Sequence, residues 1–388
     1  MLNALIATMA FALPGDSTVP TPTRPEGGDS TTDSQVVEAA AALASKTTAF
    51  KASRVYLGDG RFVDDGIVLV KDGVILNVGA GLEIPAGASI VETEGCLSAG
   101  LIALHSNDGA GAELHDSTRV VLPDADGAHA FEPSHRDFKR ARSAGITSIV
   151  LAPSSANLVG GQSVVVKTSG GKVLKLGAQL VLGLSSSALN YNKFPTSYAG
   201  AIGELERLFD SPEGAIALAA KGGLPVLLSV NDRAEILRAI TFANKYHLKG
   251  ALYGSHWAED VVPAIKASGL AVICDPFDAG DQSRAMRSVV ALANAGVRVG
   301  FGLDAPARSP ESLRFGTALC IRAGLKPAAA RKALTGDAAA IAGVGGRIGK
   351  ISRGLDADLV LWSGDPVNLA SSVEAVYIDG QRVHGGAK

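Results

Sequence analysis

The stretch that decides the fold is GKISRGLDADLV, residues 349–360, near the carboxyl end of the chain. It leads into a β-type run at 357–362, and a second run, 373–383, follows around an Asp379-Gly380 turn. Similar short runs, separated by turns such as Lys71-Asp72-Gly73, fill residues 48–93 near the other end. Asp-Gly between apolar, alternating runs is a strong hairpin signal. Both ends of the chain are therefore predicted to be β structure.

The middle of the chain has a different pattern, in which buried apolar runs alternate with segments of helical period. The strand-like runs are 97–104, 147–152, 179–184, 225–230, 250–253, 271–275 and 298–303, and the helical segments are 137–144, 198–209, 234–246, 258–267 and 283–295. Apolar strands followed by amphipathic helices indicate a parallel sheet. Seven or eight such units over about 250 residues favour a closed (β/α)8 TIM barrel over an open doubly wound sheet.

Composition and charge exclude several classes of protein. The 388 residues carry 36 Lys+Arg against 38 Asp+Glu, a formal net charge of -2, which argues against a nucleic-acid partner because phosphate binding needs a cationic surplus. Hydrophobic residues make up 47% of the chain, enough for a sizeable core. The three cysteines have no paired spacing, so neither a disulfide framework nor a zinc knuckle is expected.

Residues 1–40 are predicted to be a leader and a disordered tether. The apolar run at 1–12 is too short to span a membrane, and its Ala10-Phe11-Ala12 resembles a signal-peptidase site. No Lys or Arg precedes the run, which argues against export, so periplasmic or extracellular and cytoplasmic locations both remain open. Residues 13–34 are dense in Pro, Gly, Ser, Thr and Asp and cannot bury apolar surface.

Three stretches resemble motifs of the amidohydrolase superfamily, most nearly its imidazolonepropionase-like or dihydroorotase-like branch. They are LSAGLIALHSN at 97–107, ARSAGITSI at 141–149 and the GKISRGLDADLV stretch at 349–360. The resemblance covers roughly residues 52–383. It implies a composite β-sandwich from residues 41–97 plus 345–388 beside an amidohydrolase-like TIM barrel over residues 98–344.

The resemblance also implies a metal centre, and this sequence lacks most of its ligands. Of the residues at the family's ligand positions, His105 at the end of the first strand and Asp304 at the end of the eighth survive; Asp304 is the implied catalytic residue. The positions of four other ligands hold Asn107, Leu184, Ser229 and Gly254. His256 is a candidate stand-in because it lies two residues beyond Gly254, on the same face at strand period. The expected metal set is thus His105, Asp304 and His256, for one zinc, iron or manganese ion, or no ion if the centre has decayed.

Each candidate also has a plain structural interpretation. His105 could be a hydrogen-bonded core histidine, Asp304 a helix N-cap, and His256 part of a packed turn beside Trp257. His115, with its acidic neighbours in the loop after the first strand, is expected to lie in a solvated loop. Lys167 lies in an alternating run outside the expected fourth barrel strand and is predicted to be a surface lysine.

The run Asn157-Leu158-Val159-Gly160-Gly161-Gln162 resembles a stretch that lines the substrate entrance in the imidazolonepropionase-like branch. Its glycines would let backbone amides approach a ligand, and Gln162 could hydrogen-bond it. Asn157, Gly160, Gly161 and Gln162 are therefore the predicted substrate-binding residues, with a tight turn as the alternative interpretation.

Three functions follow from these residues. The first is an amidohydrolase-like protein with a decayed metal centre that binds a small molecule or a partner with weak or no hydrolysis. The second is an active mononuclear hydrolase of carbon-nitrogen bonds in a cyclic amide or an amino-acid derivative. The third is a scaffold or oligomer-forming protein, including a homo-oligomer, which a large apolar patch on the outer helices would favour. In each case the side chains of His105 and Asp304 are expected to approach within about 3–6 Å, since strands one and eight of a closed barrel are neighbours.

Overall fold

The computed structural model describes residues 47–189 and 194–386. The predicted leader and tether at 1–40 lie outside the described residues, as do residues 41–46 of the predicted β-sandwich. Whether the protein is exported or cytoplasmic therefore stays an open prediction. Mass spectrometry of the amino terminus of the natural protein would decide between the two.

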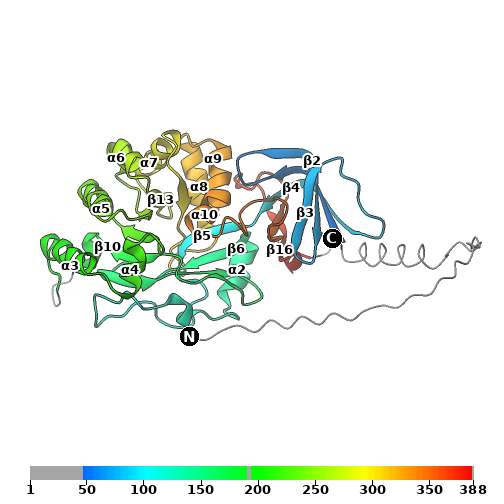
Figure 1. Cartoon of the computed structure of the whole chain (residues 1–388). Coiled ribbons are helices and arrows are strands. Elements are labelled where there is room, and N and C mark those ends of the chain that lie inside the picture. Colours follow the sequence, from blue (N-terminus) through cyan, green and yellow to red (C-terminus); the bar gives the residue numbers. More distant parts are fainter. Residues whose placement is uncertain (1–46, 190–193, 387–388) are drawn as a thin grey trace, which may run out of the picture. The chain divides into compact units, whose positions relative to one another are not determined.

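Strands from both ends of the chain form one seven-stranded sheet, at the right of Figure 1. Its order is β17-β16-β15-β4-β1-β2-β3, so the amino-terminal strand β4 pairs with the carboxyl-terminal strand β15. Asp72 and Gly73 between β2 and β3, and Asp379 and Gly380 between β16 and β17, all have positive φ, which is the geometry of tight hairpin turns. The strands are β1 (Thr47–Tyr56), β2 (Phe62–Lys71), β3 (Val74–Ala80), β4 (Ser89–Ala99), β15 (Leu359–Trp362), β16 (Val373–Ile378) and β17 (Gln381–His384).

The central part of the chain forms two further sheets, so the fold is mixed α/β. A four-stranded sheet has the order β5-β6-β8-β9, with β5 (Leu101–Ser106), β6 (Ile146–Leu151), β8 (Val164–Lys167) and β9 (Val173–Lys175). A six-stranded sheet has the order β14-β13-β12-β11-β10-β7, with β7 (Val159–Gln162), β10 (Leu180–Gly183), β11 (Val226–Ser229), β12 (Gly250–Tyr253), β13 (Ala271–Cys274) and β14 (Val299–Phe301).

The strand directions only partly follow the expected barrel repeat. β5 and β6 are parallel, and so are β10 to β14, as the buried apolar runs predict. β7, β8 and β9 instead pair antiparallel with their neighbours. No strand ladder joins the two central sheets within the described ranges, so closure into a TIM barrel and the domain boundaries at residues 97 and 345 stay predictions.

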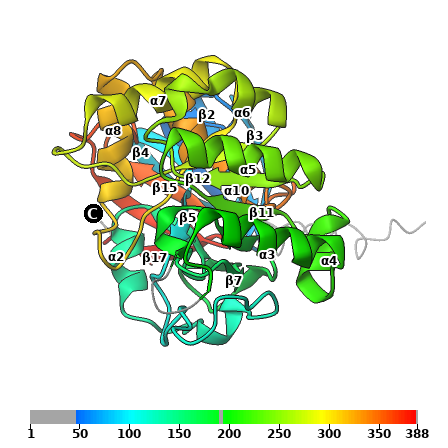
Figure 2. The same ribbon diagram turned by 90° about the vertical axis from the view of Figure 1, so that its left-hand side faces the viewer.

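Helices cover the outer side of the central strands, as Figure 2 shows. They are α2 (Asp137–Ser143), α3 (Tyr198–Asp210), α4 (Gly214–Ala220), α5 (Arg233–Lys245), α6 (Val262–Ser268), α7 (Ser283–Asn294), α8 (Ser312–Arg322), α9 (Pro327–Leu334) and α10 (Gly336–Ile341), with short 3-10 turns η1 (Gly127–Ala130), η2 (Ser186–Ala188) and η3 (Ala258–Asp260). α5 begins at a capping box, in which Asp232 accepts from the Glu235 amide and Glu235 reaches back to the Asp232 amide. Among the described helices, none has the length and apolar character needed to cross a membrane.

The strand residues divide between two cores according to the face on which they lie. Leu101, Ala103 and Leu252 belong to a large cluster with the helices, whereas Leu104 and Leu227 belong to an inner cluster with residues of α10. This alternation along each strand is the two-residue period of β structure. On β12 and β13 it places Tyr253 and Asp275 on the inner side.

Lys167 corrects the expectation of a surface lysine. Its side chain is fully buried, and its Nζ lies 2.8 Å from Asp356, 2.9 Å from Asp358 and 2.7 Å from Asp379. These carboxylates come from the 349–360 stretch and the β16–β17 turn, so the ion cluster joins β8 to the seven-stranded sheet. Burial alone would lower the pKa of Lys167, but the charge of Asp358 and the three hydrogen bonds raise it, and the ammonium stays protonated.

Candidate functional site

Polar side chains gather where the parallel strands β5, β12, β13 and β14 end. We define the strand-end site by His105, Tyr253, Asp275 and Asp304. The carbonyl oxygen of His105 accepts hydrogen bonds from the backbone amides of Leu303, at 2.8 Å, and Asp304, at 3.0 Å. The ends of β5 and β14 therefore lie side by side. Since parallel strands place their carboxyl ends at one edge, the four side chains share that edge.

The imidazole of His105 is buried without a hydrogen-bond partner. Its residue is only 8% exposed, and neither ring nitrogen has a partner. The ring stacks on Tyr253, with centroids 4.2 Å apart and planes at 16°. A Cβ at Gly302 would lie 3.2 Å from the Tyr253 ring and 3.4 Å from the Cβ of His105, so the absence of a side chain there leaves room for the stack. Burial lowers the pKa of His105 to about 4, which the charge of Asp275 only partly opposes. The ring is therefore neutral at pH 7.

Asp275 holds His256 and the loop after β12. Its Oδ2 lies 3.2 Å from His256 Nδ1 and accepts the backbone N–H of Ser255 at 3.0 Å. The hydrogen bond to Asp275 raises the pKa of His256 above its usual value. The ring also packs edge-on against Phe277, at 5.9 Å. His256 therefore directs one nitrogen to a carboxylate, and this nitrogen is not free to bind a metal ion.

Asp304 follows β14 with a φ of 53°, in the left-handed region that Asp adopts more readily than most residues. The next helix, α8, begins at Ser312 with Glu311 as its N-cap, so the helix N-cap interpretation of Asp304 is wrong. Partial desolvation raises the pKa of Asp304, Arg308 opposes that rise, and the charge of Asp275 adds to it. No hydrogen bond joins the side chains of His105 and Asp304, because both nitrogens of the ring are without partners.

The residues do not fit the metal centre that the fold implies. No three His, Cys, Asp or Glu side chains in the described part of the chain lie close enough to hold one ion. With its amide oriented to donate, Asn107 lies 3.1 Å from the Ser106 carbonyl and 3.2 Å from that of Ala152. Leu184 is buried and apolar, and Ser229 offers only a hydroxyl. Three protein ligands are the usual minimum for a catalytic zinc ion.

Gly254 is not the inward position at the end of β12. A Cβ at Gly254 would overlap the carbonyl oxygen of Val230, and φ is 118°, so no side chain fits there. Tyr253 packs against the inner cluster and stacks on His105 instead. The inward position therefore holds a phenol, which corrects the expected placement of Gly254.

The predicted substrate-binding run is mostly strand. Val159, Gly161 and Gln162 of β7 pair with β10, so the tight-turn interpretation is wrong. Gln162 donates to the Pro123 carbonyl at 3.3 Å, and Asn157 donates to the Asp116 carbonyl at 3.0 Å. These side chains hold the loop at 116–126 against β7. Their role in substrate binding stays a prediction.

Two open pockets border the loop after β5. One, of about 540 Å³, is lined by Gly160 together with Glu113, His115, Asp126 and His129. The loop that carries His115 thus borders a pocket, although its acidic and histidine side chains form no ion-binding group in the described residues.

The second pocket, of about 560 Å³, is lined by Asn107 and Pro306 together with Arg136 and Arg140. Asn107 and Pro306 each lie two residues from a member of the strand-end site. The pocket is thus lined by residues that follow the ends of β5 and β14, while none of the four residues of the strand-end site lines it.

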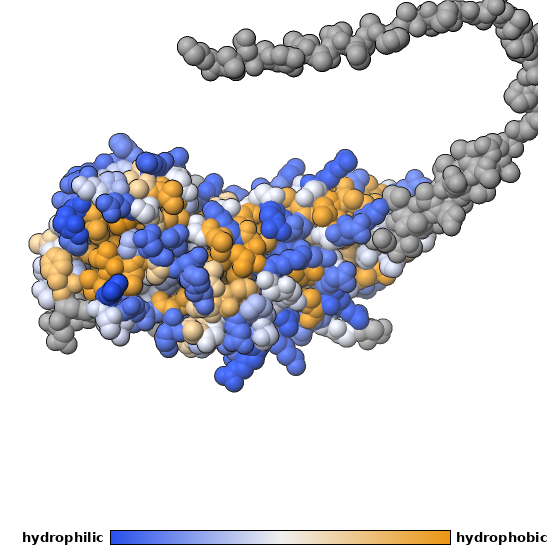
Figure 3. Space-filling model, turned by 60° about the horizontal axis from the view of Figure 1, so that its bottom comes forward, coloured by the Kyte–Doolittle hydropathy of each residue, from blue (hydrophilic) through white to orange (hydrophobic). Residues whose placement is uncertain are grey.

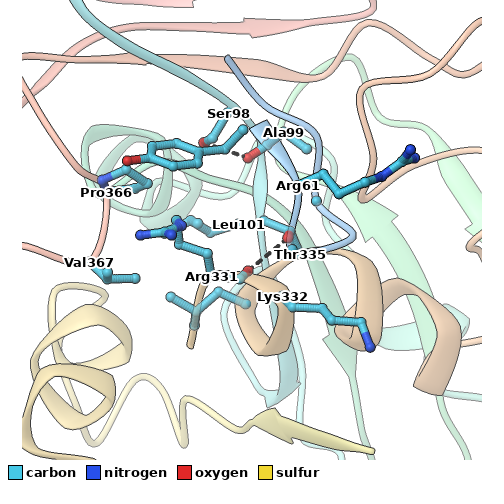
Figure 4. Close-up of a pocket in the computed structure, with 13 residues that line it drawn as sticks. Arg61, Ser98, Ala99, Leu101, Arg331, Lys332, Thr335, Pro366 and Val367 are labelled. Carbon is cyan, nitrogen blue, oxygen red and sulfur yellow. Dashed lines mark hydrogen bonds between the residues drawn. The ribbon is translucent and has the colours of Figure 1, made fainter. Parts of the chain in front are cut away.

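A third cavity lies between the seven-stranded sheet and α9, where Figure 4 shows Arg331, Ser98 and Thr335 around it. The Thr335 hydroxyl donates to the Arg331 carbonyl at 2.7 Å, and the Ser98 hydroxyl donates to the Ala99 carbonyl at 2.9 Å. The cavity has room for only about 10 Å³, the size of one water molecule.

Sequence reasoning missed Tyr253 and Asp275. Both lie at the end of an apolar strand run that was predicted correctly, and a polar residue at that place was the same signal that marked Asp304. His105, Asp304 and His256, the predicted metal set, lie in this region, but His256 is bonded to Asp275 instead of joining the other two in an ion-binding group.

Comparison with known proteins gives a consistent set of relatives. A profile described as "Amidohydrolase family" matches residues 213–384. The chain is 24% identical over 391 residues to the amidohydrolase tasK of Hapsidospora irregularis, covering 81% of this chain and 39% of that protein. It thus spans about two fifths of the length of that curated relative.

Solved structures agree with this comparison. An amidohydrolase from Thermotoga maritima MSB8 is 26% identical, with 87% of this chain and 100% of that chain covered and a TM-score of 0.78. A putative prolidase from Bifidobacterium longum, at 16% identity, 88% and 96% coverage and a TM-score of 0.57, shares the fold.

Proposed function

Because the chain belongs to the amidohydrolase superfamily, we propose that its strand-end site binds a small molecule and performs little or no metal-assisted hydrolysis. The observation that carries this proposal is the state of His105. A metal ligand needs its nitrogen lone pair directed at a point that other ligands share. His105 instead stacks on Tyr253 in a neutral form, and no described group of three ligands includes it.

The substitutions around His105 support the same proposal. Asn107, Leu184 and Ser229 stand at three of the ligand positions that the superfamily resemblance implies, and Tyr253 holds the inward position at the end of β12. An amide is a poor ligand for a transition metal, and an aliphatic side chain is none. What remains is an edge with two carboxylates, a phenol and an imidazole. These groups can hydrogen-bond a polar small molecule.

Metal analysis of the purified chain tests the proposal. We expect well under one zinc, iron or manganese ion per chain after dialysis against metal-free buffer, and no hydrolysis of amide substrates above that of a Asp304→Asn variant. Near-stoichiometric metal that disappears in both His105→Ala and Asp304→Asn would contradict the proposal.

A working mononuclear hydrolase is the second candidate, and the survival of His105 and Asp304 on adjacent strand ends favours it. In this function the two side chains, with a third ligand such as His256, would hold one ion that activates water for attack on a cyclic amide or an amino-acid derivative. His256 would first have to leave Asp275. Activity that appears on adding zinc or manganese and is lost in His256→Ala would support this function.

A scaffold or oligomer-forming role is the third possibility. Figure 3 shows apolar areas separated by polar and charged side chains on one face. Exposed large apolar residues come from different elements, for example Phe62 on β2, Ile90 on β4 and Leu218 on α4. This distribution gives little support to one broad docking surface, and light scattering of the full chain would test self-association directly.

A further inference from the structure

We infer that the strand-end site binds the ammonium group of a small organic amine, which lies among Asp275, Asp304 and the unpartnered imidazole of His105. This inference rests on the proposed function, because a bound metal ion would take the same groups. It assigns the chemical class of the ligand.

The two carboxylates supply the negative charge. No hydrogen bond to the Asp304 carboxylate occurs among the described residues, and only one oxygen of Asp275 is engaged, by His256 and Ser255. Arg308 is the cation whose charge acts on Asp304, and its guanidinium is hydrogen-bonded to Asp278. The Asp304 carboxylate and the second oxygen of Asp275 are therefore acceptors without a hydrogen-bond partner among the described residues.

His105 is the second and independent observation. A buried imidazole with both nitrogens unpartnered is unusual, because buried polar groups in proteins are nearly always hydrogen-bonded. The two nitrogens of an imidazole can offer one acceptor and one donor. A ligand that has both an N–H group and an acceptor atom would satisfy both nitrogens of the ring. Water alone could fill these positions, but the carboxylates make a charged donor the better partner.

Geometry favours an ammonium over a metal ion. Metal ligands must converge on one point at about 2.0–2.6 Å, and no described group of three does so. Hydrogen bonds from an ammonium nitrogen to each acceptor are about 2.7–3.2 Å long, so the acceptors can lie further apart than metal ligands do. The carbon atoms of the ligand can reach beyond these acceptors. An anion would meet two carboxylates instead.

Calorimetry with three probes of one shape tests the inference. Benzylammonium, benzyl alcohol and benzoate are titrated into the full chain at pH 7.5, with metal content measured on the same samples. We expect benzylammonium to bind at least about tenfold more tightly than the other two. Asp304→Asn should weaken its binding at least about tenfold, while Asn still tolerates the positive φ of this position.

Asp210→Asn is the matched control. Asp210 ends α3 and accepts the Tyr246 hydroxyl at 2.7 Å, so its loss removes one carboxylate without touching the strand ends. Its binding of benzylammonium should equal that of the unchanged chain.

The outcomes separate the two proposals. Tighter binding of benzoate, no binding of any probe, or equal losses in Asp304→Asn and Asp210→Asn would overturn the inference and leave the proposed function intact if metal is absent. Near-stoichiometric metal in the same samples would overturn the proposed function itself, whatever the probes do.

Discussion

The backbone amide of Asp304 donates a 3.0 Å hydrogen bond to the carbonyl of His105, yet the side chains of these two residues make no hydrogen bond to each other. The main chains of β5 and β14 thus bring a buried imidazole and a carboxylate to one edge and leave both available. In a working metal centre an ion would join two such residues. Here the ring of Tyr253 covers the imidazole on one face.

Replacing His105 with Phe should leave the protein as stable or raise its free energy of unfolding by up to about 1 kcal/mol. The aromatic ring keeps the stack on Tyr253, and two buried, unpartnered nitrogens are removed, which is nearly neutral or stabilising when the shape is kept. Urea unfolding at pH 7.5 measures the change. A loss of more than about 2 kcal/mol would mean that the nitrogens are bonded in solution to an ion or a ligand.

Stability should fall steeply between pH 6.5 and 4 because of His105. Its pKa is about 4 in the folded state and near 6.5 when unfolded, so in this window the unfolded chain binds the extra proton. Stability that is fully present above pH 6.5 is lost as the pH falls, by about 3 kcal/mol below pH 4. Carboxylates titrate in the same window, so the His105→Phe variant provides the reference. The difference between the two unfolding curves should show the drop, and parallel curves would rule it out.

Removing the charge of Lys167 should destabilise the fold strongly. Lys167→Met leaves Asp356, Asp358 and Asp379 without their shared, fully buried cation, and breaking a buried pair in this way costs about 3–5 kcal/mol. Lys172→Met is the control, because Lys172 contacts Asp379 from the surface and its loss should cost about 1 kcal/mol or less. Thermal unfolding of both variants distinguishes them. Equal effects would show that the cluster is solvated.

The hairpins and the parallel strands could be predicted because their signals are local. Asp-Gly turns and continuous apolar runs are complete within about ten residues. The structure has the turns at Asp72 and Asp379 and the parallel strands β10 to β14 where these signals predict them. The directions of β7, β8 and β9 could not be predicted, since a run such as Val164–Lys167 has the same pattern in either direction.

The site could be predicted only in part, because its contacts are distant in sequence. His105 and Asp304 were found at strand ends, but the partner of His256 is Asp275, nineteen residues further along, and no spacing rule links them. Lys167 was misplaced for the same reason, since its aspartates lie about 190 to 210 residues away. The backbone angle at Gly254 determines whether Tyr253 or Gly254 faces inward, and this angle cannot be read from the sequence.

The backbone angle at Gly254 also determines where a metal ligand could be restored. Gly254→Ala should lower the free energy of unfolding by about 3 kcal/mol or more, because its Cβ would overlap the Val230 carbonyl at a φ of 118°. Gly269→Ala is the matched control: its φ is 72° but nothing lies within 4 Å of a Cβ there, so only about 1 kcal/mol should be lost.

A Gly254→His protein should therefore fail to fold. Tyr253→His, in contrast, places an imidazole at the inward position beside His105. Two imidazoles with the Asp304 carboxylate approach the three ligands that zinc requires. Zinc titration of Tyr253→His should show binding at least about tenfold tighter than in the unchanged chain, and the gain should vanish when His105→Phe is added. A folded Gly254→His protein that binds zinc would instead show that β12 can shift by one residue, which would move Tyr253 away from the imidazole of His105.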